Sequence, residues 1–143
     1  MKGTPMRLNV DRPTIGPISG VVILTTLATA AIHLYLVPEE FDKGATGYGT
    51  LFVLTGVGYL AALAVMYVPW PRLSPLRGLA RLVIVGIALA AIIAYLVLGF
   101  FDTLGWVTKA IEAVLVIAAV GEVATTRGDR DDGRSSNARQ PAT

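Results

Sequence analysis

The chain has 143 residues, 54% of them hydrophobic and 15% charged, with a formal net charge of +2. An average soluble domain carries about 25% charged residues, so the composition indicates a membrane protein of about one domain. The absence of cysteine excludes disulfides, iron–sulfur clusters, thiolate metal sites and cysteine catalysis, and the single histidine excludes a bis-histidine haem within one chain.

Four segments are long and apolar enough to cross a bilayer, which requires about 20 mostly apolar residues. They are residues 19–37, 49–68, 79–101 and 104–124. We therefore predict an all-α integral membrane four-helix bundle in up-down-up-down order. The alternative is that the first segment is a cleaved signal peptide, with Ala28-Thr29-Ala30 as the cleavage site. The apolar run continues past that site to Val37, which favours a span.

The fourth segment contains Lys109, Glu112 and Glu122. A central charge costs about 2.5–3.5 kcal/mol on insertion, and each Leu, Ile, Phe or Val returns about 0.3–0.6 kcal/mol. Nine such residues in the segment offset roughly one central charge. We expect Lys109 and Glu122 to reach the two interfaces, so that Glu112 alone lies inside and needs a partner in the bundle.

The segments outside the spans have a different composition. Residues 125–143 contain no apolar residue larger than alanine and are predicted to form a disordered tail, because they cannot bury enough surface to offset the cost of ordering. Residues 1–13 are polar and mixed and are predicted to be a short N-terminal segment. The transmembrane domain is then residues 14–124.

The distribution of basic residues predicts the orientation. If four helices span, ten Lys and Arg residues lie on one side, and Lys43 and Lys109 lie on the other. By the positive-inside rule the first side, with both termini, is cytoplasmic. We expect a multi-pass protein of the plasma membrane. The basic residues then mark a membrane face, so the bilayer is an expected partner and nucleic acid is not.

Helical periodicity places a candidate polar pocket in the outer half of the bundle. Four side chains fall at similar depth there: His33, Tyr95, Lys109 and Glu112. Ionisable residues inside a membrane are functional-site candidates by default, and the competing interpretation is a structural polar clamp. Lys109 precedes Glu112 by three residues, a less favourable order for a helical pair, which leaves room for His33 as a better partner.

Periodicity also predicts the faces of the fourth span. One stripe should face the other helices: Gly105, Lys109, Glu112, Val116 and Ala119. The opposite stripe should face lipid: Leu104, Val107, Ile111, Val114 and Leu115.

Two short motifs carry a resemblance. The first span ends in AIHLYLV, with His33-Leu34-Tyr35-Leu36, and the fourth opens with WVTKAIEAVLV, from Lys109 through Glu112. The chain resembles small prokaryotic four-span membrane proteins of uncharacterised function, over roughly residues 19–124. DoxX-like proteins have a similar span count, but the sequence contains no redox motif to match theirs.

The function expected from these observations is that of an accessory or structural subunit, within a larger membrane assembly or a homo-oligomer. The alternative is a proton-coupled carrier or a protein that binds a small lipophilic, quinone-like molecule through His33 and Glu112. A membrane enzyme ranks third, because the sequence offers no nucleophile–base pair or metal cluster. We expect no catalytic residue, no metal and no cofactor.

Overall fold

A computed structural model describes residues 15–99 and 101–137, with side chains up to residue 124; the predicted N-terminal segment lies outside these ranges. The elements in chain order are α1 (Pro17–Asp42), α2 (Thr46–Tyr67), the 3-10 helix η1 (Pro71–Leu76), α3 (Arg77–Leu98) and α4 (Thr103–Asn137). Each α-helix is long and apolar enough to cross a membrane. The prediction of an all-α four-helix membrane bundle is confirmed.

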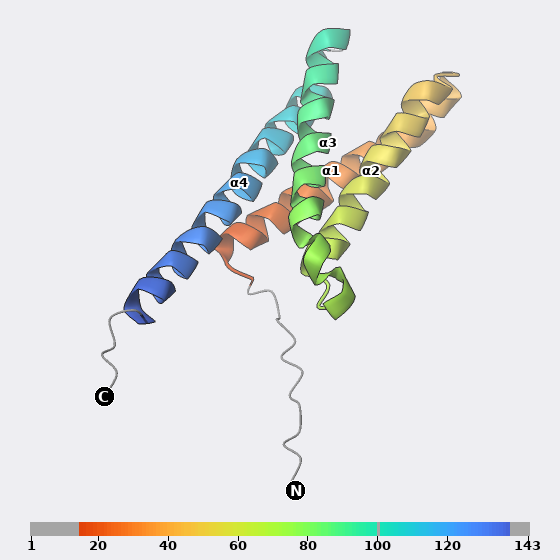
Figure 1. The fold of residues 1–143 in the computed structure, drawn as a ribbon. Helices are drawn as coiled ribbons and strands as arrows, with labels where there is room; N and C mark the ends of the chain where they lie inside the picture. The colour runs from red at the N-terminus through yellow and green to blue at the C-terminus, as the bar shows by residue number, and fades with distance from the viewer. Residues whose placement is uncertain (1–14, 100, 138–143) are drawn as a thin grey trace, which may run out of the picture.

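The helices form a bundle in which sequence neighbours run antiparallel (Figure 1). Helix α1 packs against α2 and α4, and α3 packs against the same two helices. The α1–α2 and α3–α4 turns lie at one end of the bundle, and η1 and the start of α1 lie at the other (Figure 1). This up-down order places residues far apart in the sequence at the same depth.

Helix α1 is longer than the predicted span, which ended at Val37, because it continues through Pro38 and the acidic residues that follow to Asp42. The turn that follows is short, and Gly44 adopts a left-handed conformation there, with φ of 73°, which glycine reaches at no steric cost. Outside the span, Lys43 Nζ lies 2.8 Å from Glu39 and 3.2 Å from Glu40. These hydrogen bonds raise the pKa of Lys43.

The α3–α4 turn is fixed by two capping devices. Helix α3 ends at Leu98, three residues before the predicted end of the span, because Gly99 is left-handed with φ of 72° and terminates the helix. Helix α4 begins after Asp102, whose Oδ1 accepts a hydrogen bond of 2.7 Å from the backbone N–H of Gly105. The hydroxyl of Tyr95 donates to the Asp102 carbonyl at 3.1 Å, which ties the two helices together.

At its other end, α4 runs to Asn137, beyond the predicted end of the fourth span at Ala124. The backbone is therefore helical over part of the predicted tail. The disorder expected for residues 125–143 stays a prediction.

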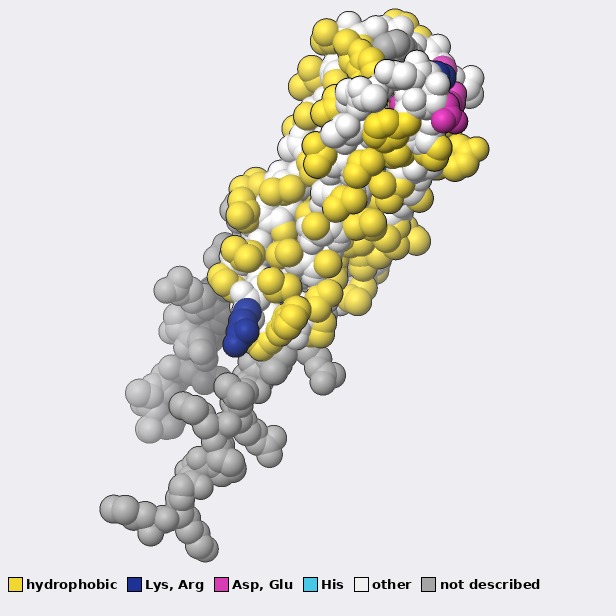
Figure 2. Space-filling view, turned by 90° about the vertical axis from the view of Figure 1, so that its right-hand side faces the viewer, with side chains coloured by type: hydrophobic (Ala, Val, Ile, Leu, Met, Phe, Trp, Pro, Cys, Tyr) yellow, Lys and Arg dark blue, Asp and Glu magenta, His cyan; other side chains and the backbone are white. Residues whose placement is uncertain are grey.

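The face of the bundle seen in Figure 2 is largely apolar along its length, with acidic side chains gathered near the end that carries the α1–α2 turn. Large side chains such as Leu24, Leu82 and Ile117 are about 70% exposed, as expected where lipid surrounds the helices. The buried core is built largely from small and medium side chains: Val22, Ala30, Tyr59, Ala62, Met66, Ala80, Ile84, Ala88, Leu115, Ala118 and Ala119. Leu115, which we expected to face lipid, is fully buried.

Candidate functional site

The first buried polar group is centred on His33, which lies on the inward face of α1 and is 5% exposed. Its Nδ1 atom lies 2.8 Å from the carbonyl oxygen of Thr29, one turn earlier in the same helix. The edge of the ring meets Phe52 of α2 at 5.6 Å between centroids. The histidine ring is therefore oriented by a carbonyl of its own helix on one side and by the Phe52 ring on the other.

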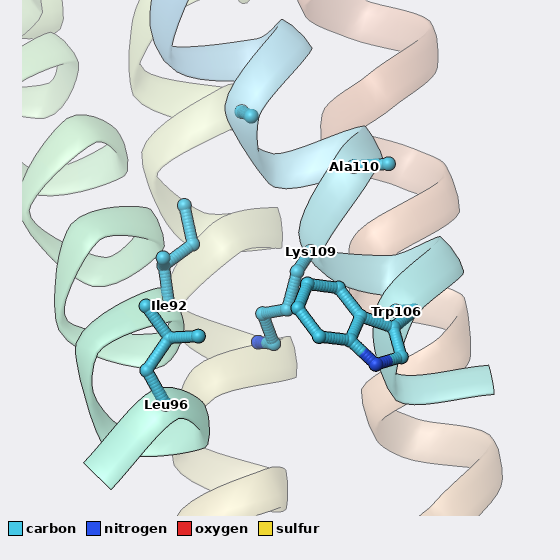
Figure 3. Close-up of a pocket in the computed structure, with 6 residues that line it drawn as sticks. Ile92, Leu96, Trp106, Lys109 and Ala110 are labelled. Carbon is cyan, nitrogen blue, oxygen red and sulfur yellow. The ribbon is translucent and has the colours of Figure 1, made fainter. Parts of the chain in front are cut away.

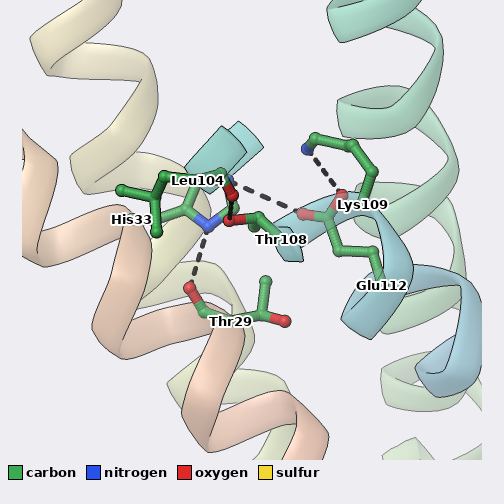
Figure 4. Close-up of polar contacts among 6 residues, drawn as sticks. All are labelled: Thr29, His33, Leu104, Thr108, Lys109 and Glu112. Carbon is green, nitrogen blue, oxygen red and sulfur yellow. Dashed lines mark hydrogen bonds and ion pairs between the residues drawn. The ribbon is translucent and has the colours of Figure 1, made fainter. Parts of the chain in front are cut away.

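Glu112 of α4 reaches the same point and is fully buried. Its Oε2 atom accepts a hydrogen bond of 2.6 Å from Lys109 Nζ, and its Oε1 atom lies 3.7 Å from His33 Nε2 (Figure 4). Of the two partners that the sequence left open for Glu112, Lys109 is therefore the nearer one and His33 the more distant. Lys109 is closer because it lies on the same helix, three residues before Glu112, and its long side chain reaches the carboxylate one turn ahead.

Tyr95 flanks this group without joining its hydrogen bonds. Lys109 Nζ lies 5.8 Å from the centroid of the Tyr95 ring, within the range of a cation–π contact. The hydroxyl points instead to Asp102 in the α3–α4 turn. The structure thus brings His33, Lys109 and Glu112 together and leaves Tyr95 at their edge, and the role of all four in binding stays a prediction.

Tyr59 of α2 is a member of this group that we did not predict. It is fully buried, and its ring lies 6.1 Å from the ring of His33. Its hydroxyl is close enough to the Glu112 carboxylate for the two groups to interact electrostatically. We refer to His33, Tyr59, Lys109 and Glu112 as the histidine cluster.

A second buried polar group, which we did not predict from the sequence, surrounds Glu122 near the η1 end of the bundle. Its Oε1 atom accepts hydrogen bonds from Ser19 Oγ at 2.5 Å and from the Tyr67 hydroxyl at 3.0 Å. Its Oε2 atom accepts one from Arg81 Nε at 3.0 Å. The four residues come from the four α-helices, one each. We refer to Ser19, Tyr67, Arg81 and Glu122 as the arginine cluster.

The arginine cluster corrects the expectation that Glu122 reaches the interface. Glu122 is 8% exposed, and three donors hold it inside. A buried carboxylate is tolerated when donors and a cation satisfy it. Arg81 lies near the start of the third predicted span and was a signal in the sequence, but we had counted it only among the basic residues of one membrane face.

An apolar layer separates the two clusters. Glu112 and Glu122 are ten residues apart on α4, a rise of about 15 Å. Between them lie buried apolar side chains that include Val22, Ile84 and Leu115. Thr26 is buried on this stretch of α1, and its hydroxyl donates at 2.6 Å to the Val22 carbonyl of its own helix. The two clusters are therefore separated by a mainly apolar stretch that also contains buried threonine.

A hollow of about 290 Å³ lies between α3 and α4 beside the histidine cluster (Figure 3). Its lining is almost entirely apolar and consists of Ile92, Leu96, Trp106, Lys109, Ala110 and Ala113. Lys109 is the one charged residue of this lining, and its ammonium is already bound to Glu112. The hollow thus offers an apolar surface and little hydrogen-bonding capacity.

These features define a small multi-pass membrane protein whose four helices are joined by two buried charge clusters. Residues 5–121 match a family of unknown function, DUF7475, and the chain belongs to that family. No curated protein and no solved structure matches the chain.

Proposed function

We propose that this protein is a non-enzymatic accessory or structural subunit of a plasma-membrane assembly, either a homo-oligomer or a larger complex. One observation carries the proposal. Among the described side chains, each buried carboxylate is paired with a basic side chain of the same protein, Lys109 for Glu112 and Arg81 for Glu122. Charges that are paired inside the protein in this way fit a role in holding its helices in a fixed arrangement.

A polar clamp is a reasonable structural device in this setting. Lipid is as apolar as leucine, so helices in a membrane associate through close packing and interhelical hydrogen bonds. The arginine cluster joins all four α-helices, and the histidine cluster joins α1, α2 and α4. Close packing is present as well, because a Cβ atom added to Gly56 would lie 2.7 Å from Leu34 Cγ. The two clusters would fix the depth and rotation of each helix.

The second candidate function is a proton-coupled carrier or a protein that binds a quinone-like molecule. The contact between His33 and Glu112 favours it, because both groups can exchange protons. The layer between the clusters argues against proton transfer across the bundle, since most of the buried side chains along this rise of about 15 Å are apolar and the Thr26 hydroxyl is bound to its own helix. The structural role is therefore the better supported of the two.

A paired substitution separates the two functions. Replacing a buried ion pair by apolar side chains of similar size is often neutral or stabilising, whereas removing one partner leaves an unpaired charge. We expect the double variant Lys109→Met with Glu112→Met to assemble and to complement a chromosomal deletion of the gene. The matched control, Lys109→Met alone, should accumulate poorly.

The measurement combines complementation with native mass analysis of protein purified in mild detergent at its natural expression level. An assembly of fixed stoichiometry that survives the double substitution supports the subunit function. A monomer without a stoichiometric partner contradicts it. A double variant that assembles normally but fails to complement also contradicts it and favours the carrier.

A further inference from the structure

The tautomer of His33 is set by its own helix. The Nδ1 atom faces the carbonyl oxygen of Thr29 at 2.8 Å. A carbonyl oxygen can only accept a hydrogen bond, so Nδ1 must carry a proton while this contact holds. The other ring nitrogen, Nε2, is then a bare acceptor whenever the ring is neutral. Helix α1 thus presents an acceptor nitrogen to α4.

The atom opposite this nitrogen is also an acceptor. Glu112 Oε1 lies 3.7 Å from Nε2, and it has no hydrogen-bond partner among the described residues, whereas Oε2 is bound by Lys109. Two buried acceptors that face each other gain nothing from the contact. A single proton placed on Nε2 would turn it into a charge-assisted hydrogen bond, for which the usual N–O distance is about 2.7–2.9 Å.

The Tyr59 hydroxyl supplies the third component. It is fully buried, lies within electrostatic reach of Glu112 and has no partner at hydrogen-bond geometry within the described ranges. A hydroxyl can rotate and can donate or accept. It can therefore donate to Glu112 Oε1 when the histidine has no proton to offer. The other titratable groups that face His33 are Lys109 and Glu112, both from α4.

We propose that His33, Tyr59 and Glu112 form a proton-binding site within the bundle. One proton from solution adds to the lone pair of His33 Nε2, no bond in the protein is broken, and the new N–H donates to Glu112 Oε1. The charge of the cluster, counted with Lys109, rises from zero to plus one. Proton uptake draws α1 and α4 together and releases the Tyr59 hydroxyl. This inference goes beyond the structural function, because a clamp requires the contact but not its titration.

His33 is the only histidine in the chain, so histidine labelled with ¹⁵N gives a spectrum of this residue alone. The experiment is a pH series by NMR on the full protein in lipid nanodiscs. We expect a neutral ring protonated on Nδ1 at high pH and a ring protonated on both nitrogens after acidification. A neutral ring protonated on Nε2 would overturn the proposal, as would a ring that stays neutral over the whole pH range in which the bundle is folded.

Matched variants identify the other members of the site. Glu112→Gln should weaken proton binding at His33 by about tenfold or more, because the carboxylate that stabilises the imidazolium is gone. Tyr59→Phe should strengthen it, because the unprotonated state loses its donor. Glu122→Gln makes the same change at the other buried carboxylate and should leave the titration unchanged. Equal titration midpoints in the Glu112 and Glu122 variants would contradict the proposal, and if Glu112→Gln does not fold, the Tyr59→Phe shift decides.

Discussion

Lys109 and Glu112 lie one turn apart on α4 and form an ion pair of 2.6 Å in a part of the bundle where the carboxylate is fully shielded from its surroundings. The pair allows the fourth helix to carry a carboxylate at that depth. It also explains why Lys109, which enters the hollow between α3 and α4, turns its ammonium inward. The stability of the bundle should therefore depend on the pair as a unit.

The first prediction concerns that pair. Lys109→Met should destabilise the bundle by about 3–5 kcal/mol, because it leaves a buried carboxylate without its cation. Adding Glu112→Met to this variant should recover most of the lost stability. The measurement is the thermal unfolding midpoint in detergent. If the double variant is as unstable as the single one, the loss comes from packing of the Lys109 stem and not from the unpaired charge.

The second prediction concerns the arginine cluster. Arg81→Met should cost about 1–3 kcal/mol, the usual penalty for leaving a buried hydrogen-bonding group without its partner. In the Glu122→Gln background, Arg81→Met should have little further effect, because substitutions within one hydrogen-bond network do not have additive effects on stability. A double-mutant cycle on thermal stability measures this coupling. Additive effects would show that the contact between Arg81 and Glu122 contributes little.

The number and type of helices could be predicted from the sequence because each apolar run is long enough to cross a bilayer on its own. The partners of Glu122 could not. They are supplied by the other three helices, and no local sequence pattern predicts that the side chains of Arg81 and Tyr67 reach Glu122. A carboxylate two residues from the end of a predicted span therefore resembled an interfacial one.

The buried face of α4 shows the limit of periodicity. The innermost positions are Thr108, Glu112, Leu115, Ala119 and Glu122, which follow the alternating spacing of four and three residues typical of supercoiled helices. The expected stripe was shifted by part of a turn, so it included Lys109 and omitted Leu115. Periodicity predicts that α4 has a buried face, but the packing of the neighbouring helices decides which residues at the border of that face are buried.

Tyr59 was missed for a related reason. Tyr59 lies further along α2 from the α1–α2 turn than His33 lies along α1, so a depth counted in residues places the two at different levels. Side chains in helices lean toward the N-terminus of their own helix. On α2 this direction is toward the α1–α2 turn, which allows the tyrosine to reach the histidine cluster.

The third prediction concerns orientation. Ten basic residues on one side against two on the other predict that both termini are cytoplasmic. A reporter that is active only outside the cytoplasm should work when inserted at Gly44, in the α1–α2 turn, and should fail when fused to Thr143. Activity at Thr143 would contradict the predicted orientation. A cytoplasmic reporter at the same two positions is the control and should give the reverse pattern.

The last prediction tests close packing between α1 and α2. A Cβ atom at Gly56 would lie 2.7 Å from Leu34 Cγ and 3.2 Å from the Ala30 carbonyl oxygen. The backbone atom cannot move without shifting α1, so Gly56→Ala should destabilise the bundle by about 1–3 kcal/mol, as expected for overpacking. Gly86 of α3 is the matched control, because nothing lies within 4 Å of a Cβ atom added there. Gly86→Ala should be neutral or stabilising by up to about 1 kcal/mol, since alanine is the better helix former. Thermal unfolding of both variants in the same detergent gives the comparison, and equal midpoints would show that α1 and α2 do not approach as closely as Gly56 requires.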